Sequence, residues 1–305
     1  MRIIQNRIYF FIFSLLVIIP GTIAIILWGL KPSIDFSGGT LLELQFSDQQ
    51  NINSQQINYE LKSQNLQDLN VVNTGSNIVL IRTKEMPKDQ VDNVKKSLGD
   101  KFGKVDEKRY ESVGPIVSTD LTKKAIYSII IASLGIIIYI AISFRKVPKP
   151  ASSLRFGICA IIALLHDLLF VIGLFAILGH YFNVEIDALF ITALLTIMGF
   201  SVHDTIVVYD RLRENLRQNV DKSFEEVAND SVNQTIIRSL ITSLTVLITL
   251  SALYIFGGAT IKYFVLALLI GIFIGTYSSI FVATPLLVVW QNIAQKRKDR
   301  KNRVK

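Results

Sequence analysis

Cysteine and histidine are scarce in this sequence of 305 residues, which contains one cysteine, Cys159, and three histidines. A single cysteine excludes an internal disulfide, and so few sulfur and imidazole ligands argue against a structural zinc site. Charged residues are also few, at 18% of the chain against 50% hydrophobic residues, and the mean hydropathy is +0.44. This balance excludes a disordered or ordinary soluble protein and favours a membrane protein.

The motifs of common enzymes are missing as well. No Walker loop, H-E-x-x-H, G-x-S-x-G or dinucleotide-binding fingerprint occurs. The SGG at residues 37–39 resembles part of a phosphate loop but lacks its Gly-Lys-Ser/Thr ending, so it is interpreted as a tight turn into a strand. We therefore expect no enzymatic activity, no cofactor and no metal.

Six apolar stretches are long enough to cross a bilayer, which needs roughly 20 residues. They are residues 8–30, 125–144, 156–178, 188–209, 240–256 and 263–290. The first follows two arginines, as a signal peptide does, but it is too long and no small-residue cleavage site follows it. It is interpreted as a retained membrane anchor.

Lysine and arginine are concentrated on one side of these spans. They occur between spans two and three, between spans four and five, and in the basic tail of residues 291–305, whereas the alternate short loops hold only Lys262. The positive-inside rule then places both termini in the cytoplasm. The excess charge of +8 favours contact with anionic lipid headgroups over nucleic acid.

These features divide the chain into four parts. Residues 1–30 form the N-terminus and first span, 31–122 an extracytoplasmic domain, 123–290 a five-span helical bundle, and 291–305 a cytoplasmic tail. Within 31–122, strands are predicted at 41–46, 70–75, 77–83 and 105–113, with helices at 53–64 and 87–102. The order βαββαβ predicts a ferredoxin-like α+β domain, which we expect to make contacts and not to do chemistry.

Ionisable residues inside a span are costly, and each is a candidate for function. Asp204 lies in the cytoplasmic third of span four, and Arg238 opens span five from the same side. Because the two residues lie at comparable depth in the membrane, we expect them to make contact. Such a contact would couple protonation of Asp204 to movement. The alternative is that Asp204 orients a helix end while Arg238 extends to the headgroups.

Other polar residues define a candidate polar pathway. Span five carries Thr242, Thr245 and Thr249 on one helical face with Thr235 and Arg238. These hydroxyls either hydrate a proton path or bond to neighbouring helices and their own helix. His166 and Asp167 in span three either shuttle protons or form a structural hydrogen bond, and His203 is expected to be only a neighbour of Asp204.

Small residues recur every four positions in span six. They are Gly271, Gly275, Ser279 and Ala283. A stripe of this kind lets another helix approach closely, so these positions are predicted to serve helix packing.

Six strings resemble the SecF family in order along essentially the whole chain. They are DFSGGT, VGP at 113–115, HDLLF, GFSVHDTIVVYDRLREN, RSLITSLT and GTYSSIFVATP. The resemblance implies half of a resistance-nodulation-division transporter in a bacterial inner membrane. It also implies that Asp204 and Arg238 match the intramembrane pair of the family.

The resemblance further implies partners and a function. SecD, which would contribute a further carboxylate, is the implied partner, with the SecYEG channel and also YajC and YidC. The complex would use the proton-motive force to promote export of unfolded preproteins. Two alternatives remain open, which are a non-conducting assembly scaffold of the translocase and half of a proton-driven exporter of small molecules or lipids.

Overall fold

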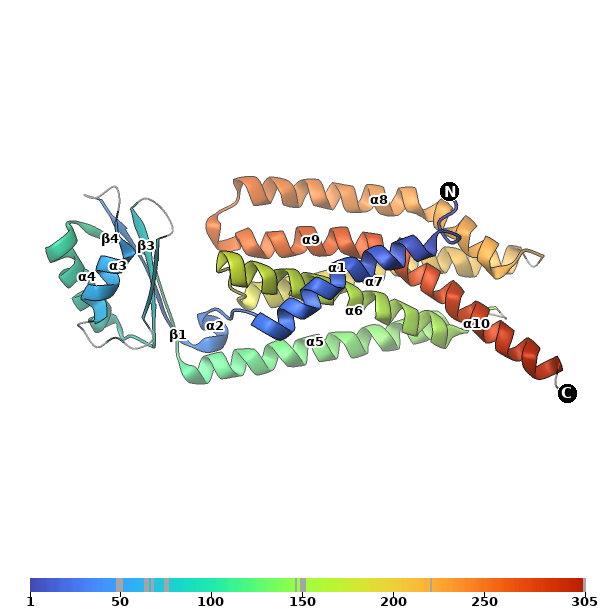
Figure 1. The fold of residues 1–305 in the computed structure, drawn as a ribbon, viewed down its shortest axis with the longest axis horizontal. Coiled ribbons are helices and arrows are strands. Elements are labelled where there is room, and N and C mark those ends of the chain that lie inside the picture. The colour runs from blue at the N-terminus through green and yellow to red at the C-terminus, as the bar shows by residue number, and fades with distance from the viewer. Residues whose placement is uncertain are drawn as a thin grey trace. The chain divides into compact units, whose positions relative to one another are not determined.

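The computed structural model describes residues 1–47, 52–62, 66, 69–73, 77–145, 147–148, 152–219 and 221–303, without the side chains of 259, 298–299 and 301–303. The chain divides into two compact units, one of Met1–Lys31 with Tyr127–Lys305 and the other Pro32–Ile126. Figure 1 shows the larger unit as a bundle of long helices and the smaller one as a sheet with helices.

Six helices of the described chain are long and apolar enough to cross a membrane, as predicted. They are α1 (Arg7–Trp28), α5 (Pro115–Ser143), α6 (Ser153–Phe182), α7 (Ala188–Gln218), α8 (Phe224–Phe256) and a sixth, Lys262–Arg297, that includes α9 (Lys262–Ser278). Several begin or end outside the predicted limits because charged turns continue the helix beyond its apolar part. Helix α8, for example, begins at Phe224 and not at residue 240.

The sixth span is not one uniform helix. A π-helical turn, Ser279–Ala283, separates α9 from α10 (Thr284–Arg303). Pro285 has no N–H to donate to the carbonyl of Phe281, which interrupts the regular hydrogen bonding at this point. In the same turn, the carbonyl of Ala283 accepts a hydrogen bond of 3.1 Å from the hydroxyl of Tyr209 in α7. Both side chains are fully buried.

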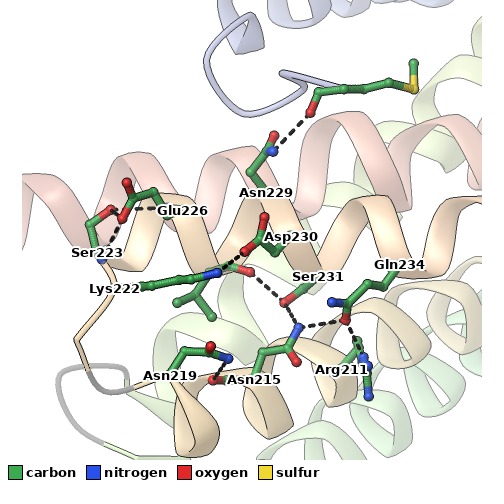
Figure 2. Close-up of polar contacts among 12 residues, drawn as sticks. Arg211, Asn215, Asn219, Lys222, Ser223, Glu226, Asn229, Asp230, Ser231 and Gln234 are labelled. Carbon is green, nitrogen blue, oxygen red and sulfur yellow. Dashed lines mark hydrogen bonds and ion pairs between the residues drawn. The ribbon is translucent and has the colours of Figure 1, made fainter.

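Short polar caps turn the chain between spans. Asn183 adopts the left-handed conformation after α6, with φ of 55°. Asp187 then caps α7 by accepting a hydrogen bond of 2.9 Å from the N–H of Phe190. At the start of α8, Ser223 and Glu226 form a reciprocal capping box, drawn in Figure 2.

Polar side chains also join α7 to α8 near that capping box (Figure 2). The amide of Asn215 donates to Ser231 and to Gln234, each at 2.9 Å. Asn229 of α8 donates to the carbonyl of Met1 at 3.0 Å, which places the N-terminus beside this end of the bundle. The last residue of the GFSVHDTIVVYDRLREN string, Asn215, therefore holds two helices together.

The smaller unit has the predicted βαββαβ order. Its elements in the described residues are β1 (Gly39–Phe46), α3 (Ser54–Lys62), β2 (Asn70–Asn73), β3 (Ile78–Thr83), α4 (Lys88–Phe102) and β4 (Val105–Val113). The antiparallel strands lie in the order β2-β3-β1-β4, and Figure 1 shows α3 and α4 on one face of the sheet. The ferredoxin-like prediction is therefore confirmed. Residues 74–76, where the predicted strands 70–75 and 77–83 meet, lie outside the described residues.

A short helix that was not predicted, α2 (Ile34–Ser37), precedes the first strand. After it, Gly38 and Gly39 have φ of 73° and 120°, which side-chain-bearing residues rarely adopt. A Cβ on Gly39 would lie 2.6 Å from the carbonyl oxygen of Thr83 in β3. The SGG segment is therefore a turn into β1, as the sequence indicates.

Candidate functional site

Asp204 is buried in the interior of the helical bundle, where α7 packs against both α8 and α9. Its side chain is 2% exposed, and its Oδ2 atom makes no hydrogen bond to any described residue. The hydroxyls of Ser239 in α8 and Thr276 in α9 lie near the carboxylate. The Oγ atom of Ser239 is likewise buried without a hydrogen-bond partner. The site thus holds a carboxylate whose hydrogen-bonding capacity is incompletely used.

Arg238 is not brought to this carboxylate. Its side chain is exposed on the surface of α8, and no ion pair links it to Asp204 in the part of the chain that the structure describes. The inward face of α8 at this level carries Ser239 instead. Because adjacent helical residues point about 100° apart, burying Ser239 turns Arg238 outward. The expected contact within one chain is therefore absent.

The threonine stripe lies on the same exposed face of α8 as Arg238. Thr242, Thr245 and Thr249 are exposed and donate to carbonyls of their own helix, at 2.9, 2.7 and 3.0 Å. Thr235, which the sequence places on the same helical face, is buried. Thr235 lies one turn from Ser231 and one turn from Ser239, which are also buried, so α8 is covered at this level.

A second polar cluster surrounds Asp167 in α6. His166 Nδ1 and Asp167 Oδ1 share a hydrogen bond of 2.9 Å. Asp167 Oδ2 accepts from Ser201 of α7 at 2.5 Å and from Ser278 of α9 at 2.7 Å. The carboxylate is completely buried, and both serines are buried with it. The structure therefore joins three helices at this one side chain.

His203 is exposed, so its side chain lies outside the buried polar region that contains Asp204. The stripe of small residues in α9 faces α7. A Cβ on Gly271 would lie 2.2 Å from Ile197, and one on Gly275 would lie 3.2 Å from the Cβ of Ser201. Ser279 is buried and donates to the carbonyl of Thr276 at 3.0 Å. These positions let α9 approach α7 at the level of both carboxylates.

Five hydroxyl residues of the two clusters were not identified as site residues from the sequence. They are Ser201, Ser239, Ser243, Thr276 and Ser278. Ser201 lies one turn before Asp204 and could have been found by its spacing. Ser239 and Ser243 form an i, i+4 pair beside the threonines, and sequence alone does not show which of the two polar faces lies inward.

Within the described ranges, no group of three histidine, cysteine, aspartate or glutamate residues is placed to hold a metal ion.

Comparison with known families and proteins agrees with this architecture. The family described as "Protein export membrane protein SecD/SecF, C-terminal" matches residues 93–293, and "SecD/SecF GG Motif" matches residues 29–50. The protein translocase subunit SecF of Thermobaculum terrenum is 50% identical over 95% of this chain and 94% of its own length. The chain belongs to the SecF family. The SecF of Anaerolinea thermophila is 42% identical over 96% of this SecF-family chain.

Longer relatives contain a region similar to this SecF-family chain. The SecDF of Bacillus subtilis is 36% identical over 96% of this chain but only 38% of its own length. A crystal structure of SecDF from Thermus, described as a translocon-associated membrane protein, has a TM-score of 0.83 and 30% identity over 96% of this chain. The chain spans 39% of that structure. A second SecDF structure, in a super-membrane-facing form, has a TM-score of 0.71. The chain is thus a multi-pass membrane protein of the Sec export machinery.

Proposed function

We propose that this chain works with SecD in the inner membrane and uses the proton-motive force to promote preprotein export through SecYEG. Asp204 binds and releases the proton in this proposal, and Arg238, on the exposed face of α8, pairs with a carboxylate of SecD. The chain acts in transport and not as an enzyme. Its outer domain contacts the emerging polypeptide, and YajC and YidC join the same assembly.

The observation that carries this proposal is the incompletely bonded carboxylate of Asp204. A carboxylate that is 2% exposed within a membrane bundle is expensive unless it is paired or protonated. No lysine or arginine pairs with it among the described residues. Binding of a proton neutralises the carboxylate and removes most of the cost of burying it. The stability of this arrangement of helices therefore depends on whether Asp204 carries a proton.

The exposed face of α8 supports SecD as the partner. Arg238 and the threonine stripe lie on this face, where a cation facing lipid alone would be costly. A second helical bundle that brings a carboxylate to Arg238 would remove this cost. The fused SecDF relatives, which contain a SecF-like region within a longer chain, are consistent with such a neighbour.

The available energy is sufficient to shift a conformational equilibrium. Moving one proton through about 100 mV supplies roughly 2.3 kcal/mol. The energy from one proton changes the ratio of two conformations by roughly 50-fold, and the energy from two protons changes it by more than roughly 1,000-fold. The positively charged loops and tail favour cytoplasmic termini, so protons would enter from the side of the outer domain.

The test is preprotein export into vesicles that contain this chain, SecD and SecYEG, with and without an imposed proton-motive force. Asp204→Asn should remove the force-dependent increase in export while leaving ATP-driven insertion in place. Asp210→Asn is the matched control, because Asp210 lies on the same helix but is exposed and pairs with Arg213. It should retain the increase.

Assembly must be measured in the same preparations, by the amount of SecD that co-purifies with each variant. An Asp204→Asn chain that still assembles and retains the full force-dependent increase would contradict proton coupling through Asp204. That result would favour the scaffold function instead.

A further inference from the structure

The His166–Asp167 pair has no role in the function proposed above, yet both of its side chains are buried inside the bundle. Asp167 is 0% exposed and His166 is 7% exposed. The Nε2 atom of His166 is buried without a hydrogen-bond partner among the described residues. A purely structural hydrogen bond explains Nδ1 but leaves this second ring nitrogen as an unsatisfied polar atom.

Charge balance at this pair calls for a proton. An ionised Asp167 beside a neutral imidazole would leave one uncompensated negative charge inside the membrane. Neither lysine nor arginine forms an ion pair with Asp167 in the described part of the chain. One added proton makes the pair neutral, either as a carboxylic acid beside imidazole or as a carboxylate beside imidazolium.

The neighbouring elements place few other ionisable groups near the pair. Helix α9 brings the ring of Tyr277 to 6.4 Å from that of His166, and α7 carries Asp204 one turn beyond Ser201, which bonds Asp167. Helix α1 contributes the neutral hydroxyl of Ser14, which donates to Tyr277 at 3.4 Å. The described π-helical turn contains no ionisable residue. Asp204 is therefore the acidic group best placed to influence the pair.

The same two helices bound both carboxylates. On α7, Ser201 bonds Asp167 and lies one turn before Asp204. On α9, Ser278 bonds Asp167, while Thr276 lies near Asp204 and bonds Ser243 of α8 at 2.6 Å. A change in the charge of Asp204 that shifts α7 against α9 must also change the hydrogen bonds at Asp167.

We propose that His166 and Asp167 form a second proton-binding site, linked to Asp204 through the hydroxyls and helices that the two sites share. This inference rests on the proposed function, since it assigns a further residue pair to the same proton pathway. The reaction is the binding of one proton by imidazole and carboxylate together. It forms one N–H or O–H bond and involves no oxidant or reductant.

The test is nitrogen NMR of the full chain with ¹⁵N-labelled histidine, assembled with unlabelled SecD in lipid nanodiscs. Only three histidines occur in the chain, so His180→Gln and His203→Gln assign the signals. A proton-binding site predicts that the His166 ring nitrogens change their chemical shifts between about pH 5 and about pH 9. A structural hydrogen bond predicts constant shifts, and constant shifts would overturn the proposal.

Coupling is tested by repeating the titration in Asp204→Asn. The midpoint for His166 should move by roughly one pH unit if the two sites interact. The midpoint for His180, which stacks on Trp28 at the end of α6, should not move. Ser201→Ala should weaken the response, whereas Thr192→Val, a change to an exposed hydroxyl of α7, should not.

An unchanged His166 midpoint in Asp204→Asn would overturn the link between the sites. This failure is distinguishable from failure of the proposed function. Force-dependent export that requires Asp204, together with a His166 that does not titrate, would leave the proposed function standing and remove only the second site.

Discussion

The crossing of α1 and α6 predicts a strong effect of one added methyl group. A Cβ on Gly173 would lie 2.6 Å from the Cα of Gly21, 2.8 Å from its carbonyl carbon and 3.0 Å from its carbonyl oxygen. Ordinary contacts between carbon atoms are about 3.5–4.0 Å. All three neighbours are backbone atoms, so no side chain can rotate away. Gly173→Ala therefore requires α1 and α6 to separate by about 1 Å.

The expected cost of such overpacking is about 1–3 kcal/mol. Alanine also favours a helix over glycine by up to about 1 kcal/mol, which offsets part of the loss. The matched control is Gly199→Ala in α7, where an added Cβ meets nothing within 4 Å. It carries the same helix preference without the clash. The difference between the two variants should therefore equal the packing cost alone.

The assay is reversible unfolding of the full chain in bicelles, with the free energy of unfolding measured for both variants. Gly173→Ala should be less stable than Gly199→Ala by about 1–3 kcal/mol. A difference below about 0.5 kcal/mol would refute the reasoning, because it would mean that the two helices separate at little cost.

Two predictions concern the outer domain. Gly39→Ala should destabilise it by about 1–3 kcal/mol, because φ is 120° and the new Cβ would meet the carbonyl of Thr83. Hydrogen exchange of β1 in the full chain should accelerate, whereas Gly99→Ala, which has open space, should leave it unchanged. A hydrogen bond from Lys95 to Glu107 raises the pKa of that lysine. Its stabilisation is present below the pKa of the unfolded chain and lost as pH rises through the folded pKa. Lys95→Met should therefore lower the melting temperature at neutral pH but not at strongly alkaline pH, and equal loss at both would contradict the assignment.

Much of this architecture was predictable because it rests on local sequence patterns. An apolar run of sufficient length forms a membrane-spanning helix wherever it lies in the chain. The six spans and the βαββαβ order of the outer domain were predicted for that reason. The π-helical turn before Pro285 was not, although a proline late in a span is a visible signal.

The candidate site was only partly predictable. Asp204 was identified because a carboxylate in an apolar run is rare and costly. Its expected contact with Arg238 is absent among the residues that the structure describes, and Ser239 lies near the carboxylate instead. Depth along a helix can be read from sequence, but contact also requires the right rotation about the helix axis.

Composition and spacing indicated a six-span membrane protein with a small α+β domain and ionisable residues within its spans. These properties depend on the length of each apolar run and on alternation within each strand, which are local. Only the tertiary structure decided that Ser239 lies inward while Arg238 and Thr242 lie outward, and that Asp167 is shared by α7 and α9. Lipid and the protein interior are both apolar, so either face of a membrane-spanning helix can be turned toward the other helices. Hydrophobicity therefore does not determine how a helix is rotated about its own axis. Close packing at Gly271 and Gly275, together with hydrogen bonds between helices, determines it instead.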